Sequence, residues 1–467
     1  MKSISKRQFD AFCYVRQAAT SLFSEEILWF ESGDKKVLAI VIQDLSDGKY
    51  GYVILGRDAR NLFRAIEVSP DFKSSIPNLL DDLSIRLHYY CHDGQPNYPQ
   101  GDEISKPTQI FKPVYEEDKL HCYFIKLAQE STYEAARNLI SEIAYSFEDV
   151  DGNYIEQFQT TGFDARLWEL YLHVFFNNSG FSIDKSKNVP DYCLEKLGEE
   201  CFVEAVTVGA NEQFDLPNPH SAEEVVEYSK DYMAIKFGSA LFSKVNRKNK
   251  YWEIEHVKGH PFILAIHDYH QPPDTSSPAS MTWSRAALSN YLFGIRDVVE
   301  FDVNGKPSSA MEETKNGLIP KMEVIKEHRF KHKVIPSNFF EQAGTEHVSA
   351  VLFSNAATIP TFNRMGKLAG LGSKDVKMIR SGVKMSESGR IISFATNIDS
   401  DSYEESWGDN MVMYHNNNAV NPVDPDLFDQ ITHIRYNKDI DGFEFIQNFN
   451  EYFSSTTSVI KIIEKNE

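Results

Sequence analysis

A charged residue in the middle of an apolar run constrains the fold of this chain more than any other feature. The run Phe202-Val203-Glu204-Ala205-Val206 has the composition of a buried strand. Successive side chains of a strand point to opposite faces, so Glu204 shares its face with Phe202 and Val206. An ionised carboxylate on such a face is costly unless it is paired or bound to a metal ion. The chain must therefore fold so that a cation reaches Glu204.

A predicted helix over residues 163–177 offers a second carboxylate. Apolar side chains cover most of the circumference of this helix, which predicts that it is largely buried. The remaining narrow polar stripe contains Arg166, Glu169 and His173. Glu169 is therefore a candidate metal ligand. An ion pair between Arg166 and Glu169 on an exposed edge is the alternative.

A third carboxylate opens the strand predicted over residues 191–197. Pro190 has no N–H and suits the first position of a strand, and Asp191 follows it directly. A tight turn then leads to a second strand, 201–208, which contains Glu204. Mg²⁺ prefers one or two carboxylates together with water and phosphate oxygens. The pattern therefore favours a Mg²⁺ site at Asp191 and Glu204, in which Mn²⁺ is expected to substitute.

The elements continue with a loop over 209–220, a long helix over 221–246 and a strand over 261–269 that is nearly continuous in apolar residues. Such a run is typical of a strand buried on both faces. The chain thus contains an acidic residue on a helix, then Pro-Asp at the start of a strand, then an acidic residue within the next strand. This order resembles the pattern of the PD-(D/E)xK nuclease superfamily. The resemblance covers residues 155–270 and implies a restriction-endonuclease-like α-β-β-β-α-β core. It maps the superfamily's metal-binding acids to Glu169, Asp191 and Glu204.

The chain departs from this superfamily at its lysine. The motif Lys lies two residues after the strand acid, and Val206 occupies that position here. Some members take the Lys from the following helix, which here contains Lys236 and Lys244. Lys244 is the favoured candidate because it lies at the basic end of the helix, and Lys236 is the alternative.

The resemblance implies a metal-dependent nuclease that cleaves DNA, with RNA as the alternative substrate. The chain as a whole also resembles long bacterial proteins, through runs such as those at 156–172, 250–270 and 354–366. Bacterial nucleases of the superfamily often act in restriction, repair or defence against phage. A nuclease-like binding or sensing module, acting with a partner protein or as a homo-oligomer, is the alternative function.

The net charge of −20 argues against a protein that coats nucleic acid, although it is compatible with a local basic groove. The candidate contacts to the nucleic-acid backbone are three basic residues beside the predicted Lys, namely Arg247, Lys248 and Lys250. The basic run at 326–333 is interpreted as solvated surface.

Histidines provide a second possible metal site, a zinc site built from His256, His260, His267 and His270. Gly259 and Pro261 flank His260, so the first two are not expected to share a helix. We therefore interpret His267 and His270 as hydrogen-bonded residues near a strand end. No P-loop, nucleophile-elbow or dinucleotide-binding pattern is present.

Length and composition complete the expected architecture. A chain of 467 residues predicts two or three domains, here an N-terminal α+β domain over 1–150, a nuclease-like domain over 151–334 and a mixed region over 335–467. The first domain should contain an initial helix and an antiparallel meander over 27–68. The five cysteines form no CxxC pair, which favours reduced thiols in a cytoplasmic protein. No apolar run is long enough to span a membrane, and the start lacks the apolar segment of a secretory signal.

Overall fold

A computed structural model describes residues 1–14, 16, 18–103, 106–147, 149, 152–209, 222–270, 284–303, 307–314, 317–386, 390–437, 442–446 and 452–462. The chain is a mixed α+β protein with several sheets, as predicted. Its central sheet has eight strands, in the spatial order β23 (Gly442–Ile446), β22 (Thr432–Asn437), β21 (Val412–His415), β18 (Ala350–Ser354), β9 (Phe262–Asp268), β8 (Glu199–Val208), β7 (Tyr192–Lys196) and β6 (Ser182–Ile183).

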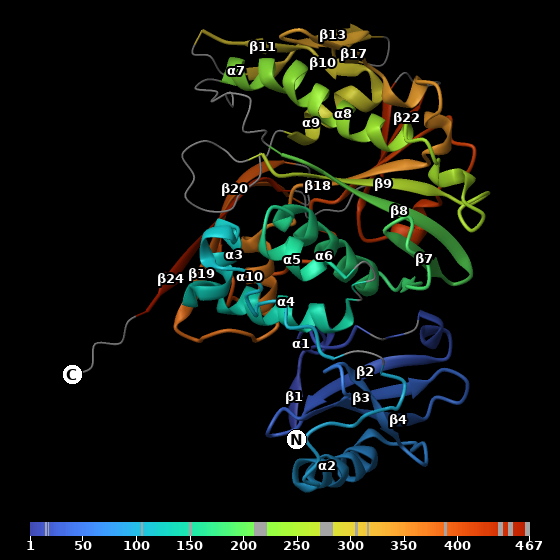
Figure 1. Cartoon of the computed structure of the whole chain (residues 1–467), viewed down its shortest axis with the longest axis vertical. Coiled ribbons are helices and arrows are strands. Elements are labelled where there is room, and N and C mark those ends of the chain that lie inside the picture. The colour runs from blue at the N-terminus through green and yellow to red at the C-terminus, as the bar shows by residue number, and fades with distance from the viewer. Residues whose placement is uncertain are drawn as a thin grey trace.

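Helices cover both faces of the central sheet (Figure 1). One face packs against α3 (Cys122–Gln129), α4 (Glu134–Ser146), α5 (Tyr154–Gln159), α6 (Phe163–Asn178) and α10 (Ile359–Leu368). The other packs against the π-helical turn η4 (Tyr228–Met233), α8 (Ala234–Val245) and α9 (Ser284–Phe293), with α7 (Ala222–Glu227) leading into η4. The predicted helix over 221–246 is thus interrupted by a π turn. Most of the predicted loop 209–220 lies outside the described residues.

The strand β9 is buried along its whole length because it pairs in parallel with β8 on one side and with β18 on the other. This confirms the prediction from its apolar sequence. The helix α6 is also buried, and the indole N–H of Trp168 donates a hydrogen bond of 3.0 Å to the carbonyl of Ala265 in β9. The bond ties the helix that contains Glu169 to the centre of the sheet.

The N-terminal part forms a five-stranded antiparallel sheet of β1 (Lys2–Ile4), β2 (Ser24–Glu31), β3 (Val37–Asp44), β4 (Tyr50–Arg57) and β5 (Phe63–Val68). The helix α2 (Ile76–His92) covers one face of this sheet. The predicted meander is confirmed. The predicted initial helix is wrong in extent, since α1 spans only Lys6–Asp10, after β1 has added to the edge of β2.

Two further groups of strands complete the fold. A three-stranded sheet contains β20 (Ile391–Asn397), β19 (Val376–Met385) and β24 (Tyr452–Lys461). Four short pairs occupy residues 295–336, namely β10 (Ile295–Asp297) with β15 (Met322–Val324), β11 (Val299–Phe301) with β12 (Pro307–Ser309), β13 (Met311–Thr314) with β14 (Gly317–Pro320), and β16 (Glu327–Phe330) with β17 (Lys333–Pro336).

Packing does not divide the chain at the predicted boundaries. Strands from both sides of residue 334 share the central sheet. Helices α3 and α4 precede residue 150, yet they contribute to the same core as α6. All five cysteines are free, and Cys193 and Cys201 belong to cores on opposite faces of the sheet. No helix within the described ranges is long and apolar enough to cross a membrane.

Candidate active site

The candidate site lies in a notch where β8 extends beyond its partner β7. The last paired positions place Tyr192 opposite Val203, so the next step brings Asp191 opposite Glu204. Just before the first residue of β7, Oδ2 of Asp191 accepts a hydrogen bond of 2.8 Å from the backbone N–H of Ala205. The residue before one strand and the middle of the next strand therefore bring two carboxylates together on the face covered by α8. The sequence predicted that these two acids lie on adjacent strands, but not which face they share.

Glu204 is buried, with 6% of its surface exposed, and its Oε1 atom accepts two hydrogen bonds. The ammonium of Lys244, in the last turn of α8, lies 2.7 Å from this oxygen. The hydroxyl of Tyr251 donates the second bond. A cation and a neutral donor thus compensate the burial of the Glu204 carboxylate.

Tyr251 is the one residue of this centre that the sequence did not indicate. It lies in the short turn η5 (Tyr251–Glu253), where its ring stacks on Phe262 at 5.0 Å. The guanidinium of Arg247 lies 4.1 Å from the centre of the same ring. Burial and the charge of Glu204 raise the pKa of Tyr251, which keeps its hydroxyl protonated as a donor. Arg247, a predicted nucleic-acid contact, therefore also holds Tyr251 in place.

The two candidate lysines lie on different turns of α8, so only one of them reaches the carboxylates. Lys244 reaches Glu204, whereas Lys236 lies eight residues earlier, about 12 Å along the helix axis. The ammonium of Lys236 is 3.4 Å from the carbonyl of Gly209 and 5.6 Å from the ring of Tyr232. Of the two, Lys244 is the residue that meets the carboxylate pair.

Glu169 forms an ion pair with Arg166, which was the predicted alternative to metal binding. Its Oε2 lies 2.6 Å from the guanidinium of Arg166, which also donates to Gln157 at 2.9 Å. Burial raises the pKa of Glu169, Arg166 partly offsets this, and repulsion from Glu204 adds to the increase. The pair is partly buried rather than on an exposed edge. His173 of the same polar stripe contacts Ser146 instead, at 2.9 Å.

The carboxylates of the site repel one another. Loss of water, together with repulsion from Glu204 and Glu169, raises the pKa of Asp191 above the usual value of an aspartate. Much of the Asp191 surface nevertheless faces solvent, and water reduces the size of this effect. A divalent cation between Asp191 and Glu204 would remove the repulsion.

The residues present fit a divalent cation in part. Asp191 and Glu204 supply two carboxylates side by side, and both contacts of Glu204 fall on Oε1. This donor set is what Mg²⁺ uses when it also keeps water and phosphate oxygens. No group of three or more His, Cys, Asp or Glu side chains within the described residues is arranged to hold a metal ion. Glu169 therefore does not form a three-carboxylate metal site with Asp191 and Glu204.

Three of the four histidines, His256, His267 and His270, make hydrogen bonds, and His260 lies near a carboxylate. His267 Nε2 accepts a bond of 2.9 Å from the N–H of Ala357, and His270 Nδ1 lies 2.7 Å from Asp268. His256 contacts the carbonyl of Val189 at 2.8 Å, and His260 lies 3.6 Å from Glu200. In the described part of the chain these residues do not form the zinc site considered above.

The other basic residues predicted from the sequence are Lys248, Lys250 and the run at 326–333, and none of these described residues contacts Glu204 in an observed hydrogen bond or ion pair. Lys248 is exposed, and Lys250 donates to the carbonyl of Val245 at 2.6 Å. The basic run at 326–333 forms the hairpin of β16 and β17, where Arg329 is exposed. His328 is buried and contacts Ser337 at 2.8 Å. Apart from His328, the run is exposed or partly exposed, in agreement with its interpretation as surface.

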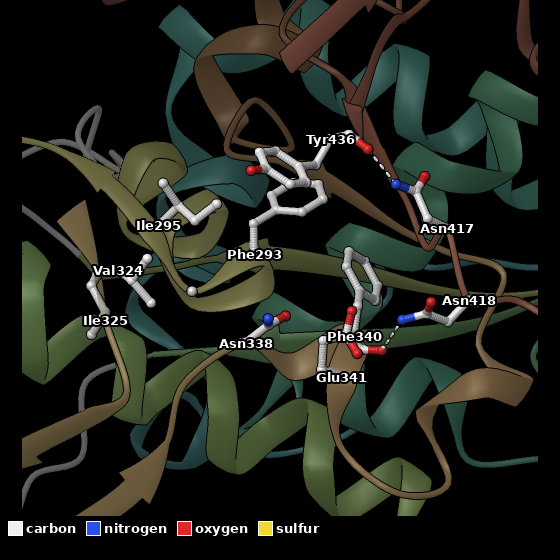
Figure 2. Close-up of a pocket in the computed structure, with 11 residues that line it drawn as sticks. Phe293, Ile295, Val324, Ile325, Asn338, Phe340, Glu341, Asn417, Asn418 and Tyr436 are labelled. Carbon is white, nitrogen blue, oxygen red and sulfur yellow. Dashed lines mark hydrogen bonds between the residues drawn. The ribbon is translucent and has the colours of Figure 1, made fainter. Parts of the chain in front are cut away.

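A separate hollow of about 190 Å³ lies towards the opposite edge of the central sheet (Figure 2). Phe293, Phe340 and Tyr436 surround it. The amide of Asn418 donates to the carbonyl of Phe340 at 3.1 Å, and Asn417 donates to the carbonyl of Tyr436. None of the predicted site residues lines this hollow, so it is not part of the candidate site.

The fold and the site together define a mixed α+β protein with a pair of carboxylates and a lysine where β8 of the central sheet extends past β7. No family model, no curated protein and no solved structure matches the chain.

Proposed function

We propose that this chain is a metal-dependent nuclease that cleaves phosphodiester bonds, with DNA as the expected substrate and RNA as the alternative. The observation that carries the proposal is the meeting of Asp191, Glu204 and Lys244. Asp191 lies directly before β7, Glu204 lies in β8, and Lys244 comes from α8, 40 residues after Glu204 in the sequence. Two acids that can hold a metal ion, with a cation beside them, are suited to metal-assisted phosphodiester hydrolysis.

The order of elements supports the same proposal. Around the site the chain runs through α6, β6, β7, β8, α8 and β9, and β8 pairs in parallel with β9. This order is similar to the α-β-β-β-α-β core of the PD-(D/E)xK superfamily. A role in restriction or in defence against phage is part of the proposal and follows from that resemblance.

Each residue has a separate task in the proposed reaction. Asp191 and Glu204 would hold Mg²⁺, which supplies activation of a water molecule and neutralises charge on the scissile phosphate. Lys244, with its ammonium beside Glu204, would orient the attacking water or stabilise charge that develops on the phosphate. Tyr251 keeps the Glu204 carboxylate in one orientation through its hydroxyl.

The test is cleavage of supercoiled plasmid, linear DNA and RNA by the full chain in Mg²⁺ or Mn²⁺. Metal-dependent cutting by the wild type would identify the substrate. Binding of metal and nucleic acid without cutting would favour the alternative, a nuclease-like binding or sensing module that acts with a partner. The Arg166–Glu169 ion pair is the observation that favours this alternative, because it removes one carboxylate from the metal.

Lys244→Ala should lower the cleavage rate by about 10²- to 10³-fold, as expected for the loss of one electrostatic contact to the transition state. The matched control is Lys236→Ala on the same helix, which should change the rate by less than about threefold. Mn²⁺ binding, followed by calorimetry, should persist in Lys244→Ala because both carboxylates remain. Equal rates for the two lysine variants would remove Lys244 from the reaction.

A further inference from the structure

A cavity of about 370 Å³ lies between the N-terminal part of the chain and the layer of helices that contains α4 and α10 (Figure 1). The helix α1 and the segment after it form one wall, and α4, α10 and the segment around residue 405 form the others. Clefts that bind small organic molecules have volumes of about 300–1,000 Å³. The cavity is therefore large enough for a small ring compound.

Part of the lining is apolar and comes from three different helices. Ala11 follows the last residue of α1, Leu139 lies in α4 and Met365 lies in α10, and all three are buried. The sulfur of a methionine makes favourable contacts with aromatic rings. This wall therefore favours a ligand with an apolar, aromatic body.

Two aromatic side chains of the lining have polar groups without a hydrogen bond in the described part of the chain, namely the hydroxyl of Tyr14 and the indole N–H of Trp407. These residues are only 7% and 9% exposed, and buried Tyr and Trp side chains usually find a partner. In the same core, Trp168 donates to the carbonyl of Ala265 at 3.0 Å, and Tyr171 donates to the carbonyl of Trp407 at 2.7 Å. The two donors without a bond are thus suited to oxygen atoms of a ligand.

The lining contains two acids and two bases, and three of these four charges are already paired. Asp10 forms ion pairs with Lys6 at 2.8 Å and with Arg16 at 2.5 Å. The carboxylate of Glu405 is occupied by the guanidinium groups of two buried arginines. The half-buried Arg7 donates one bond of 3.2 Å to the backbone carbonyl of Glu405 and makes no ion pair with any described residue. Arg7 is thus the one charge of the lining that lacks a counter-charge among the described residues.

We propose that this cavity binds a small aromatic carboxylate, with the carboxylate at Arg7 and the ring against the apolar wall. A guanidinium presents parallel N–H groups that match the two oxygens of a carboxylate. Tyr14 and Trp407 donate to a further oxygen of the ligand, such as a hydroxyl on its ring. The site is independent of the proposed nuclease function, because Asp191, Glu204 and Lys244 do not line the cavity.

The test is calorimetric titration of the full chain with benzoate, salicylate and naphthoate, and with the amide of each compound. The carboxylates should bind with a Kd of about 10 µM to 1 mM, as expected for compounds with so few atoms. The amides have nearly the same shape but lack the negative charge, so they should bind at least about tenfold more weakly.

Two variants locate the binding. Arg7→Gln keeps a donor for the Glu405 carbonyl and should weaken binding of the carboxylates about tenfold while leaving the amides unchanged. Tyr14→Phe should weaken binding of salicylate about threefold without lowering the thermal midpoint, because the hydroxyl has no bond to lose in the free protein. The control is Arg390→Gln, an exposed arginine outside the cavity, which should bind all compounds as the wild type does.

Absence of saturable binding of all three carboxylates up to about 5 mM would overturn the inference. Equal affinity of the wild type for carboxylates and amides would also overturn it, and this comparison requires no variant to fold. Equal affinity of the wild type and a folded Arg7→Gln for the carboxylates would place the binding elsewhere. The titrations involve neither nucleic acid nor a metal ion, so each of these results leaves the nuclease proposal standing.

Discussion

Glu204→Gln should lower the rate of metal-dependent cleavage at least about 10³-fold, which corresponds to about 4 kcal/mol of lost transition-state stabilisation. The amide keeps the size of the side chain and still accepts a hydrogen bond from Tyr251, so the strand should remain folded. It removes the negative charge that would attract both the metal ion and Lys244. The rate of plasmid nicking in Mg²⁺ or Mn²⁺, at equal protein concentration, is the measurement.

Two further variants show whether this loss belongs to the carboxylate pair. Asp191→Asn should give a loss of similar size, because Asp191 lies beside Glu204, directly before the neighbouring strand β7. Glu199→Gln changes an exposed carboxylate on the same strand β8 and should leave the rate within about twofold. Equal cutting by the wild type and both site variants would place the activity elsewhere and reject the assignment.

Glu405→Gln should destabilise the protein by about 3–5 kcal/mol, because it leaves buried cations without their counter-charge. Glu405 is 4% exposed and accepts two bonds from the guanidinium of Arg364, at 2.8 and 2.6 Å. Arg380, also buried, lies 3.3 Å from the same carboxylate. The network joins α10 and β19 to the segment around residue 405. Chemical denaturation followed by circular dichroism measures the change.

The pH dependence of this effect follows from the pKa of Glu405. Burial alone would raise that pKa, but Arg364 and Arg380 more than offset it and lower the pKa to about 2. A carboxylate with a lowered pKa stabilises the fold above its unfolded pKa of about 4.3 and loses this contribution as the pH falls towards 2. The difference between wild type and Glu405→Gln should therefore be constant from pH 6 to 8 and shrink below pH 4.

The control for the stability prediction is Glu404→Gln, the exposed neighbour, which should stay within about 0.5 kcal/mol of wild type. A change of similar size for both glutamates would mean that the buried network contributes no more than a surface charge.

Periodicity and composition predicted most of the elements around the site, namely α6, β7, β8 and β9, but not β6 or the π turn between α7 and α8. The apolar run of β9 and the nearly all-apolar helix α6 indicate buried elements by composition alone, and the alternation in β8 indicates which face Glu204 shares. Asp191 and Glu204 were predicted to share a Mg²⁺ site because a tight turn joins the two strands at which they lie and Mg²⁺ prefers one or two carboxylates. These features are local, so a single sequence contains them.

Contacts between distant residues could not be predicted in the same way. Nothing in the turn at residue 251 indicates that the Tyr251 hydroxyl reaches Glu204, because the contact depends on how α8 ends against the sheet. The partner of Glu169 was left open between Arg166 and a metal ion, since helical spacing permits both. The strands that extend the central sheet beyond β9 come from residues 350–446, and their pairing is equally non-local.

Calorimetric titration of Mn²⁺ into the full chain tests the central claim most directly, because it asks whether Asp191 and Glu204 form a metal site without requiring turnover. Wild type and Glu199→Gln should show saturable binding, and Asp191→Asn and Glu204→Gln should bind at least about tenfold more weakly. Absence of saturable binding to the wild type, or equal binding to all four proteins, would contradict the metal site and with it the proposed nuclease.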